Sequence, residues 1–141
     1  MTRARILVAV LAIAALLGWL RDPPWLAGMT HGLGEWNVDE SGTRARWAAG
    51  RSSFFVPAET RTVRFAVRTT FDNPNDWPVV VSVTLDDRAV ERVTLDDPTW
   101  RVVEIAMPAE GSRRHRRIDL HVNRLRAETR GVLVGEVDIV R

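Results

Sequence analysis

The most distinct pattern in the chain is an unbroken apolar run near its start, from Ile6 to Leu20. These fifteen consecutive residues carry no charge, whereas Arg3 and Arg5 precede the run and Arg21 follows it. As a helix rising about 1.5 Å per residue, the run would be about 22 Å long, which lies between a signal-peptide core and a minimal membrane anchor. The pattern therefore predicts a chain that is targeted to a membrane.

The residues around the run favour a retained anchor with its N-terminus in the cytoplasm. Positive charge is kept on the cytoplasmic side, and Pro23-Pro24 would end the helix. The nearest pair of small residues, Ala27 and Gly28, follows Trp25-Leu26 and makes a poor cleavage site. A cleaved signal sequence and a buried helix of a soluble protein are the alternatives. We expect residues 1–21 to form the anchor, 22–31 a linker and 32–141 one domain.

After residue 30 the apolar positions recur with a period of 2, which is typical of half-buried β-strands. Val63, Phe65 and Val67 alternate with polar or small residues, and Val79 to Leu85 is rich in β-branched residues. Gly135 suggests a bulge in the last strand. The predicted fold is all-β, an antiparallel jelly-roll β-sandwich of about eight strands after one N-terminal transmembrane helix. The expected strands are residues 43–48, 53–56, 63–68, 79–85, 89–95, 100–107, 118–123 and 132–140.

Charge and cysteine content narrow the function of this domain. Arg3, Arg5 and Arg21 belong to the anchor, so residues 22–141 hold 17 Arg against 18 Asp and Glu. A near-neutral domain argues against a nucleic-acid partner, whose phosphates require a surplus of positive charge. The chain has no cysteine, so it has neither disulfides nor a thiolate nucleophile.

The order of tryptophans, glycines and strand ends resembles the galactose-binding-like jelly-roll domains of bacterial membrane-anchored envelope proteins. The resemblance covers roughly residues 32–140. It rests on Glu35-Trp36, Gly42, Arg46-Trp47-Ala48, Gly50, Phe55-Val56-Pro57, Trp100 through Pro108, Arg117-Ile118-Asp119-Leu120 and Gly131-Val132. It implies a non-catalytic domain that binds glycans through loops or one concave face, sometimes with a structural calcium ion. It also implies an extracytoplasmic place, periplasmic or extracellular, at a bacterial inner membrane.

The candidate ligand-binding residues are aromatic or lie in one polar row. An exposed indole can stack on a sugar ring, and Trp36 and Trp77 stand among polar residues and turns, whereas Trp47 and Trp100 are expected in the core. On the predicted last-but-one strand, the polar face carries Asp119, His121 and Asn123.

Two further groups of side chains suggest weaker sites. If residues 79–85 and 89–95 form a hairpin, the loops before and after it meet at one end. A structural calcium ion would then find oxygen ligands there, although Asp and Asn before proline are also ordinary turn residues. The candidate metal ligands are Asp72, Asn73, Asn75, Asp76, Asp96 and Asp97.

The second group is a basic run that follows residue 112 in a predicted loop. Basic side chains near a membrane attract anionic headgroups, and they would equally suit an acidic polysaccharide or simply be solvated. The candidates for contact with an anionic surface are Arg113, Arg114, Arg116 and Arg117.

Three functional hypotheses follow. The first is a glycan-binding module of envelope polysaccharide metabolism, whose discriminating feature is at least one exposed tryptophan beside polar groups in a concavity. The second is a protein-interaction or scaffold subunit of a larger membrane complex, which requires an exposed apolar patch. The third, an enzyme such as a hydrolase, is disfavoured because the three histidines lack metal-ligand spacing and no serine stands in a nucleophile elbow.

Overall fold

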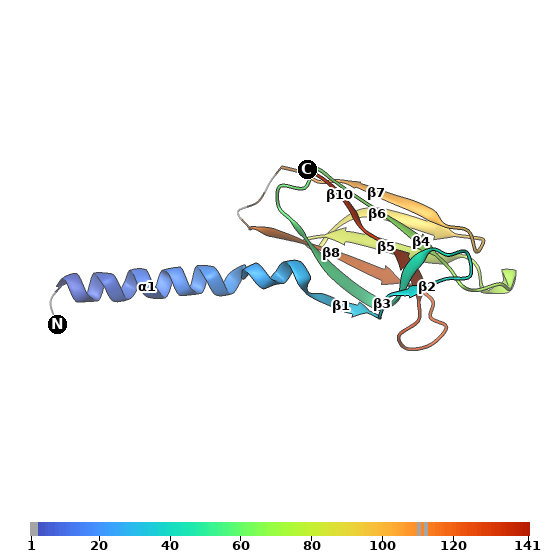
Figure 1. Ribbon diagram of the computed structural model, residues 1–141, viewed down its shortest axis with the longest axis horizontal. Helices are drawn as coiled ribbons and strands as arrows, with labels where there is room; N and C mark the ends of the chain where they lie inside the picture. The colour runs from blue at the N-terminus through green and yellow to red at the C-terminus, as the bar shows by residue number, and fades with distance from the viewer. Residues whose placement is uncertain (1–2, 110, 112) are drawn as a thin grey trace.

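The computed structural model describes residues 3–109, 111 and 113–141, so Met1 and Thr2 of the predicted anchor region lie outside it. It confirms an antiparallel all-β sandwich preceded by one apolar helix (Figure 1). The helix projects from one end of the sandwich, and the strands run broadly along the same long axis.

The N-terminal helix α1 (Arg3–Arg21) is followed by a short 3-10 turn, η1 (Pro24–Gly28). Residues 3–28 are long and apolar enough to cross a membrane, a test that an N-terminal signal sequence would also pass. No residue of α1 is buried against the sandwich. Trp19 of α1 and Trp25 of η1 pack edge to face with ring centroids 4.7 Å apart, so the aromatic pair joins the end of the helix to the 3-10 turn.

In the part of the chain that the structure describes, the sandwich contains ten strands, and every ladder between them is antiparallel. Their bounds are β1 (Thr30–Leu33), β2 (Asn37–Val38), β3 (Arg44–Pro57), β4 (Thr62–Arg68), β5 (Val79–Leu85), β6 (Arg88–Leu95), β7 (Arg101–Ala106), β8 (His115–Val122), β9 (Val132–Gly135) and β10 (Asp138–Val140).

The long strand β3 connects two layers. Its first half pairs with β9, and β9 pairs with β4. Strand β4 pairs in turn with β7 and, at its start, with β10. Its second half pairs with β1 on one side and β8 on the other, and β8 continues through β5 to β6. The five-stranded layer β1-β3-β8-β5-β6 therefore faces a second layer across the core, which consists of the first half of β3 with β9, β4, β7 and β10.

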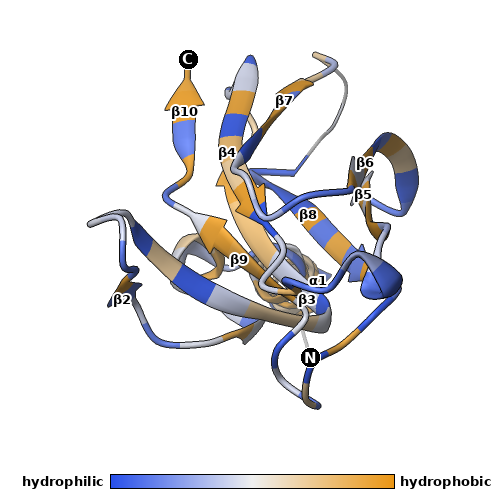
Figure 2. Cartoon of the chain, turned by 90° about the vertical axis from the view of Figure 1, so that its right-hand side faces the viewer, coloured by the Kyte–Doolittle hydropathy of each residue, from blue (hydrophilic) through white to orange (hydrophobic). Residues whose placement is uncertain are grey.

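The core is built from alternate residues of the strands in both layers. Figure 2 shows the alternation as orange and blue bands along β4 and β8. Phe54 of β3 and Phe65 of β4 meet edge to face across the layers, with ring centroids 5.8 Å apart. Among the largest fully buried side chains are Phe65, Leu95, Ile118 and Leu120. The other face of each strand is left to solvent.

The strands differ from those expected in four places. The strands predicted at 43–48 and 53–56 are one strand, because Arg51 and Ser52 between them stay in the ladder with β8. The strand predicted at 132–140 is split into β9 and β10 just after Gly135. Strands β1 and β2 were not predicted, and β1 begins inside the expected linker. Strand β8 begins at His115, so part of the predicted basic loop is strand.

The helix is joined to the sandwich through Asp22. One carboxylate oxygen of Asp22 lies 3.1 Å from Nδ1 of His115, and the other accepts a hydrogen bond from the amide of Arg114. Pro23 is buried, and η1 packs against β3. The junction therefore contacts the domain directly through residues 22–28.

The hairpin between β5 and β6 turns through Asp86 and Asp87, which both have positive φ, of 47° and 69°. Two left-handed residues are the requirement of a tight two-residue hairpin whose twist matches its strands. Asparagine and glycine are the usual residues there, so aspartate needs support from its surroundings. The Asp86 amide donates to the carbonyl of Arg117, which ties the turn to β8.

Candidate functional site

The solvent face of the five-stranded layer carries two rows of polar side chains that cross its strands. In one row, Ser53 of β3 is paired with Asp119 of β8, which is paired in turn with Thr84 of β5. Paired residues on one face of a sheet lie about 5 Å apart, so their side chains are in reach of one ligand.

The second row lies two residues along each strand. It runs from Arg51 of β3 through His121 of β8 and Ser82 of β5 to Arg92 of β6. His31 of the edge strand β1 is paired with Ser53 and extends the first row.

These rows line a cleft of about 530 Å³, which we call the open-face cleft. Strands β1, β3, β5 and β8 and the β5–β6 turn form its walls. Its lining residues are His31, Arg51, Ser52, Ser53, Thr84, Asp87, Arg117, Asp119 and His121. All of them are polar or charged, so the cleft suits a hydrophilic ligand.

One end of the cleft is held by ion pairs around Arg117. Its Nε donates to Asp119 Oδ2 at 2.8 Å and its Nη2 to Asp87 Oδ1 at 2.5 Å. The hydrogen bond with Asp119 outweighs burial and, with the charges of Asp119 and Asp87, raises the pKa of the Arg117 guanidinium. Thr84 Oγ1 lies 3.5 Å from the same Asp119 oxygen. This end is therefore an oriented network in which two carboxylates share one guanidinium.

The other end of the cleft has a different character. His31, Arg51 and His121 are all exposed there. No hydrogen bond or ion pair joins the Arg51 side chain to another residue that the structure describes. Gly32, beside His31, has a φ of +64°, and a Cβ at this position would clash with the carbonyl oxygen of Arg51. The glycine lets β1 lie closely against β3, which positions His31 beside the cleft.

The five candidate ligand residues are distributed over several parts of the fold. Asp119 and His121 line the open-face cleft. Asn123 does not, because its Oδ1 accepts a hydrogen bond from the Val80 amide at 2.7 Å, which closes the end of the β5–β8 ladder.

The two tryptophans expected to be platforms are half-buried and do not line the cleft. The guanidinium groups of Arg44 and Arg46 lie 4.8 and 4.4 Å from the centroid of the Trp36 ring. The Nε1 of Trp77 donates to the carbonyl of Phe71 at 2.9 Å. Both indoles are thus engaged with the chain itself.

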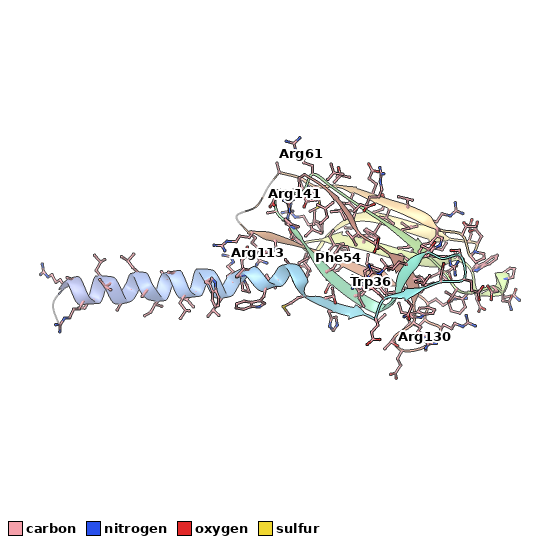
Figure 3. The ribbon with its side chains drawn as sticks, in the orientation of Figure 1. Trp36, Phe54, Arg61, Arg113, Arg130 and Arg141 are labelled. Carbon is pink, nitrogen blue, oxygen red and sulfur yellow. The ribbon has the colours of Figure 1, made fainter. Side chains whose placement is uncertain are left out.

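Trp47 was expected in the core, but it is half-buried and lines a second concavity of about 380 Å³. Glu35, Thr129 and Arg130 share this concavity, and the Arg130 guanidinium lies 5.5 Å from the centroid of the Trp47 ring. Figure 3 labels Arg130 on the loop that precedes β9. A tryptophan beside polar groups in a concavity is therefore present, at a position that the sequence did not indicate.

Trp100 likewise is half-buried rather than enclosed in the core. The Arg68 guanidinium lies 5.3 Å from the centroid of its ring. Its indole nitrogen is buried and has no hydrogen-bond partner among the residues that the structure describes.

The two loops that carry the candidate metal ligands, residues 72–76 and 96–97, lie at the same end of the β5–β6 hairpin, because Val79 is paired with Leu95. Their side chains serve the turns: Asn73 accepts a hydrogen bond from the Asn75 amide at 3.0 Å, and Asp97 accepts one from the Thr99 amide at 2.9 Å. Arg101 pairs with both Asp96 and Asp97, and Asp76 lies 3.7 Å from Arg124. Within residues 3–109, 111 and 113–141, no three Asp, Glu or His side chains form a group that could hold a metal ion.

The basic run does not form one exposed surface. Arg113 and Arg114 are exposed, and Arg113 lies beside the end of the helix (Figure 3). Arg116 is only 8% exposed, because strand β8 directs it inward, and it pairs with Asp86. Arg117 belongs to the network in the open-face cleft. Only the first two of the four predicted residues are therefore placed to meet an external anionic surface.

No family model matches the chain, and no curated protein matches it either. Solved structures similar to it include a family two carbohydrate esterase from Cellvibrio japonicus (15% identity, TM-score 0.47, 77% of this chain and 29% of the esterase). A CBM36-1 domain of a multidomain xylanase from the hindgut metagenome of Trinervitermes trinervoides is 14% identical, with a TM-score of 0.46 over 77% of this chain and 89% of the domain. A family 35 carbohydrate binding module from an environmental isolate is 13% identical, with a TM-score of 0.46 over 78% of this chain and 87% of the module. The chain spans less than a third of the esterase. At this level the likeness concerns the fold, and the ligands of those proteins are not transferred to this chain.

Proposed function

We propose that this protein is a non-catalytic, membrane-tethered β-sandwich that binds a glycan in the open-face cleft. The observation that carries the proposal is the lining of the cleft, which consists of hydrogen-bonding side chains on four strands and a turn of one rigid sheet. Sugar hydroxyls both donate and accept hydrogen bonds. The cleft offers donors such as Arg117 and acceptors such as Asp119 side by side. Its volume of about 530 Å³ falls in the range of small-ligand sites, while its polarity selects against apolar ligands.

The arrangement of the acidic groups supports binding rather than glycoside hydrolysis. Hydrolysis requires two carboxyl groups on opposite sides of the scissile bond, one of them protonated. The two carboxylates in the cleft, Asp87 and Asp119, are both bound to the same guanidinium, that of Arg117. Both carboxylates therefore lie at one end of the cleft on a single guanidinium, and they do not flank a space for a scissile bond from opposite sides.

The proposed tether is α1, which would cross the inner membrane of a bacterium once. At about 1.5 Å per residue its 19 residues extend for about 28 Å, close to the thickness of the hydrocarbon layer. Arg3 and Arg5 favour a cytoplasmic N-terminus, which would leave the sandwich outside and within reach of envelope polysaccharide.

A glycan array probed with the full chain in detergent micelles tests the proposal. Ser53 lies on the solvent face at the centre of the cleft, so Ser53→Trp should fill the cleft and abolish retention on the array. The matched control is Val102→Trp, because Val102 is 65% exposed on β7 of the other layer. Retention that persists in Ser53→Trp would place binding elsewhere, with the Trp47 concavity as the next site to block.

The alternative is a protein-interaction or scaffold subunit beside a larger membrane protein. Failure of the chain to bind any glycan, together with co-purification of one membrane protein that Ser53→Trp leaves unchanged, would overturn the glycan proposal in favour of this alternative.

A further inference from the structure

The two ends of the open-face cleft differ in charge balance. At one end, the guanidinium of Arg117 is shared by the carboxylates of Asp87 and Asp119. At the other end, Arg51 lies opposite His121 in the β3–β8 ladder. No acidic side chain pairs with Arg51 among the residues that the structure describes.

The groups that face Arg51 from neighbouring strands do not supply a counter-charge. His121 and then Ser82 lie opposite Arg51 on β8 and β5, and His31 of β1 is paired with Ser53, two residues further along β3. The carboxylate in the adjacent row, Asp119, is already held by Arg117. A guanidinium without a counter-charge, on the wall of a concave site, concentrates positive potential where a ligand would enter.

This inference rests on the proposed function and names its ligand class: we propose that the open-face cleft selects an acidic glycan, with the anionic group of one sugar bound by Arg51, His31 and His121. The planar guanidinium of Arg51 binds a carboxylate through two parallel hydrogen bonds, which a neutral hydroxyl cannot match. Ser53 and the Arg117–Asp119 network lie next along the cleft and receive the hydroxyls of the adjoining sugar. The cleft therefore recognises a charge and a hydroxyl pattern at neighbouring positions.

The test compares acidic polysaccharides with their own neutral forms. The full chain in detergent micelles is titrated calorimetrically with polygalacturonate, alginate and hyaluronan, each beside the same polymer after reduction of its carboxyl groups. At least one acidic polymer should bind at least tenfold more tightly than its reduced form. Its affinity should fall with added salt, because the attraction is between charges.

The variant Arg51→Gln keeps a hydrogen-bonding side chain but removes the charge. It should weaken binding of the acidic polymer at least tenfold, so that the ratio of the affinities for the acidic and reduced forms falls towards one. Arg61→Gln is the matched control. Arg61 is an exposed arginine whose amide donates to Val140, at the edge of the sandwich beside the C-terminus (Figure 3).

The outcomes separate this inference from the proposed function. Equal binding of acidic and reduced polymers, blocked by Ser53→Trp, would overturn the selection for acidic glycans and leave glycan binding intact. Binding only to neutral glycans of the array would do the same. An acidic polymer whose affinity is unchanged in Arg51→Gln would also overturn it. Failure to bind any glycan would overturn both.

Discussion

The carboxylate of Asp86 lies 2.5 Å from Nε of Arg116, an arginine that strand β8 directs into the sandwich and leaves only 8% exposed. The same carboxylate accepts a hydrogen bond from the amide of Arg117, and the Arg116 guanidinium also donates to the carbonyl of Pro108. One aspartate thus supports its own left-handed turn and neutralises a buried charge.

Replacing Asp86 with asparagine should destabilise the sandwich. The change keeps an acceptor for the Arg117 amide but leaves the guanidinium of Arg116 without its counter-charge in a buried place. Because Asp86 is partly exposed, we expect a loss of about 1–2 kcal/mol in the free energy of unfolding, less than for a fully enclosed pair. Urea unfolding followed by circular dichroism measures it. The exposed loop variant Asp72→Asn should match the wild type.

The same residue predicts a pH dependence of stability. Burial alone would raise the pKa of Asp86, but hydrogen bonds from the Arg117 amide and the Arg116 guanidinium bring it below its usual value of 3.8. A carboxyl group whose pKa is lower in the folded state contributes stability above its unfolded pKa and loses it as pH falls through the folded value. The difference in melting temperature between wild type and Asp86→Asn should therefore shrink below about pH 4. A difference that stays constant from pH 6 to about pH 3 would contradict this assignment.

Gly32 and Gly34, which flank Leu33, give a matched pair of substitutions. Gly32→Ala forces a Cβ into the carbonyl of Arg51 at a φ of +64°, whereas a Cβ on Gly34 meets its nearest neighbours in Trp47 at an ordinary 3.7 Å. We expect Gly32→Ala to cost about 1–3 kcal/mol and to weaken ligand binding by displacing β1. Gly34→Ala should stay near the wild type. Thermal unfolding and calorimetric titration of both variants test the prediction, and equal behaviour would contradict it.

A substitution at Asn123 tests whether this residue stabilises the fold or binds the ligand. Its Oδ1 accepts a hydrogen bond from the Val80 amide, and its own amide donates to the carbonyl of Val80 at 3.1 Å. Asn123→Ala should lower the free energy of unfolding by about 1 kcal/mol, because it leaves a strand amide without its partner. Glycan affinity should not change, since Asn123 lies outside the cleft. A drop in affinity without a drop in stability would instead assign Asn123 to ligand binding.

The junction between helix and sandwich can be opened at Asp22. Asp22→Ala removes the contacts with His115 and the Arg114 amide. We expect residues 22–30 to become more accessible, so that limited proteolysis of the full chain in lipid nanodiscs releases the sandwich faster. The melting temperature of the released domain should match that of wild type. Asp76→Ala, in a loop at the other end of the domain, is the control, and cleavage at the wild-type rate would show that the contacts do not hold the junction.

The sequence was sufficient to predict strands in which apolar and polar residues alternate because one face of the strand is buried. Strand β5 runs from Val79 to Leu85 as expected, because its valines alternate over its whole length. Strand β3 could not be predicted as one element. Its middle, from Gly50 to Ser52, has the polar composition of a turn, yet Arg51 and Ser52 stay in the ladder with β8 where the strand passes between layers.

The cleft was predictable only where it lies on a single strand. Asp119 and His121 stand out as the polar face of β8, but Arg51 and His31 join them through pairing between strands, which leaves no trace in local sequence. Arg116 carried a usable signal. Extending the inward row of Ile118 and Leu120 back by two residues places it inside, although its composition groups it with an exposed basic run.

The direct seating of η1 on β3 also has a mechanical consequence. A domain on a flexible linker would reorient under a lateral force. Here α1 is joined to the sandwich through the contacts of Asp22 and the buried Pro23. If α1 spans a membrane and the open-face cleft holds a polymer, as proposed, drag on the polymer would be transmitted as torque to the helix and through it to the surrounding lipids.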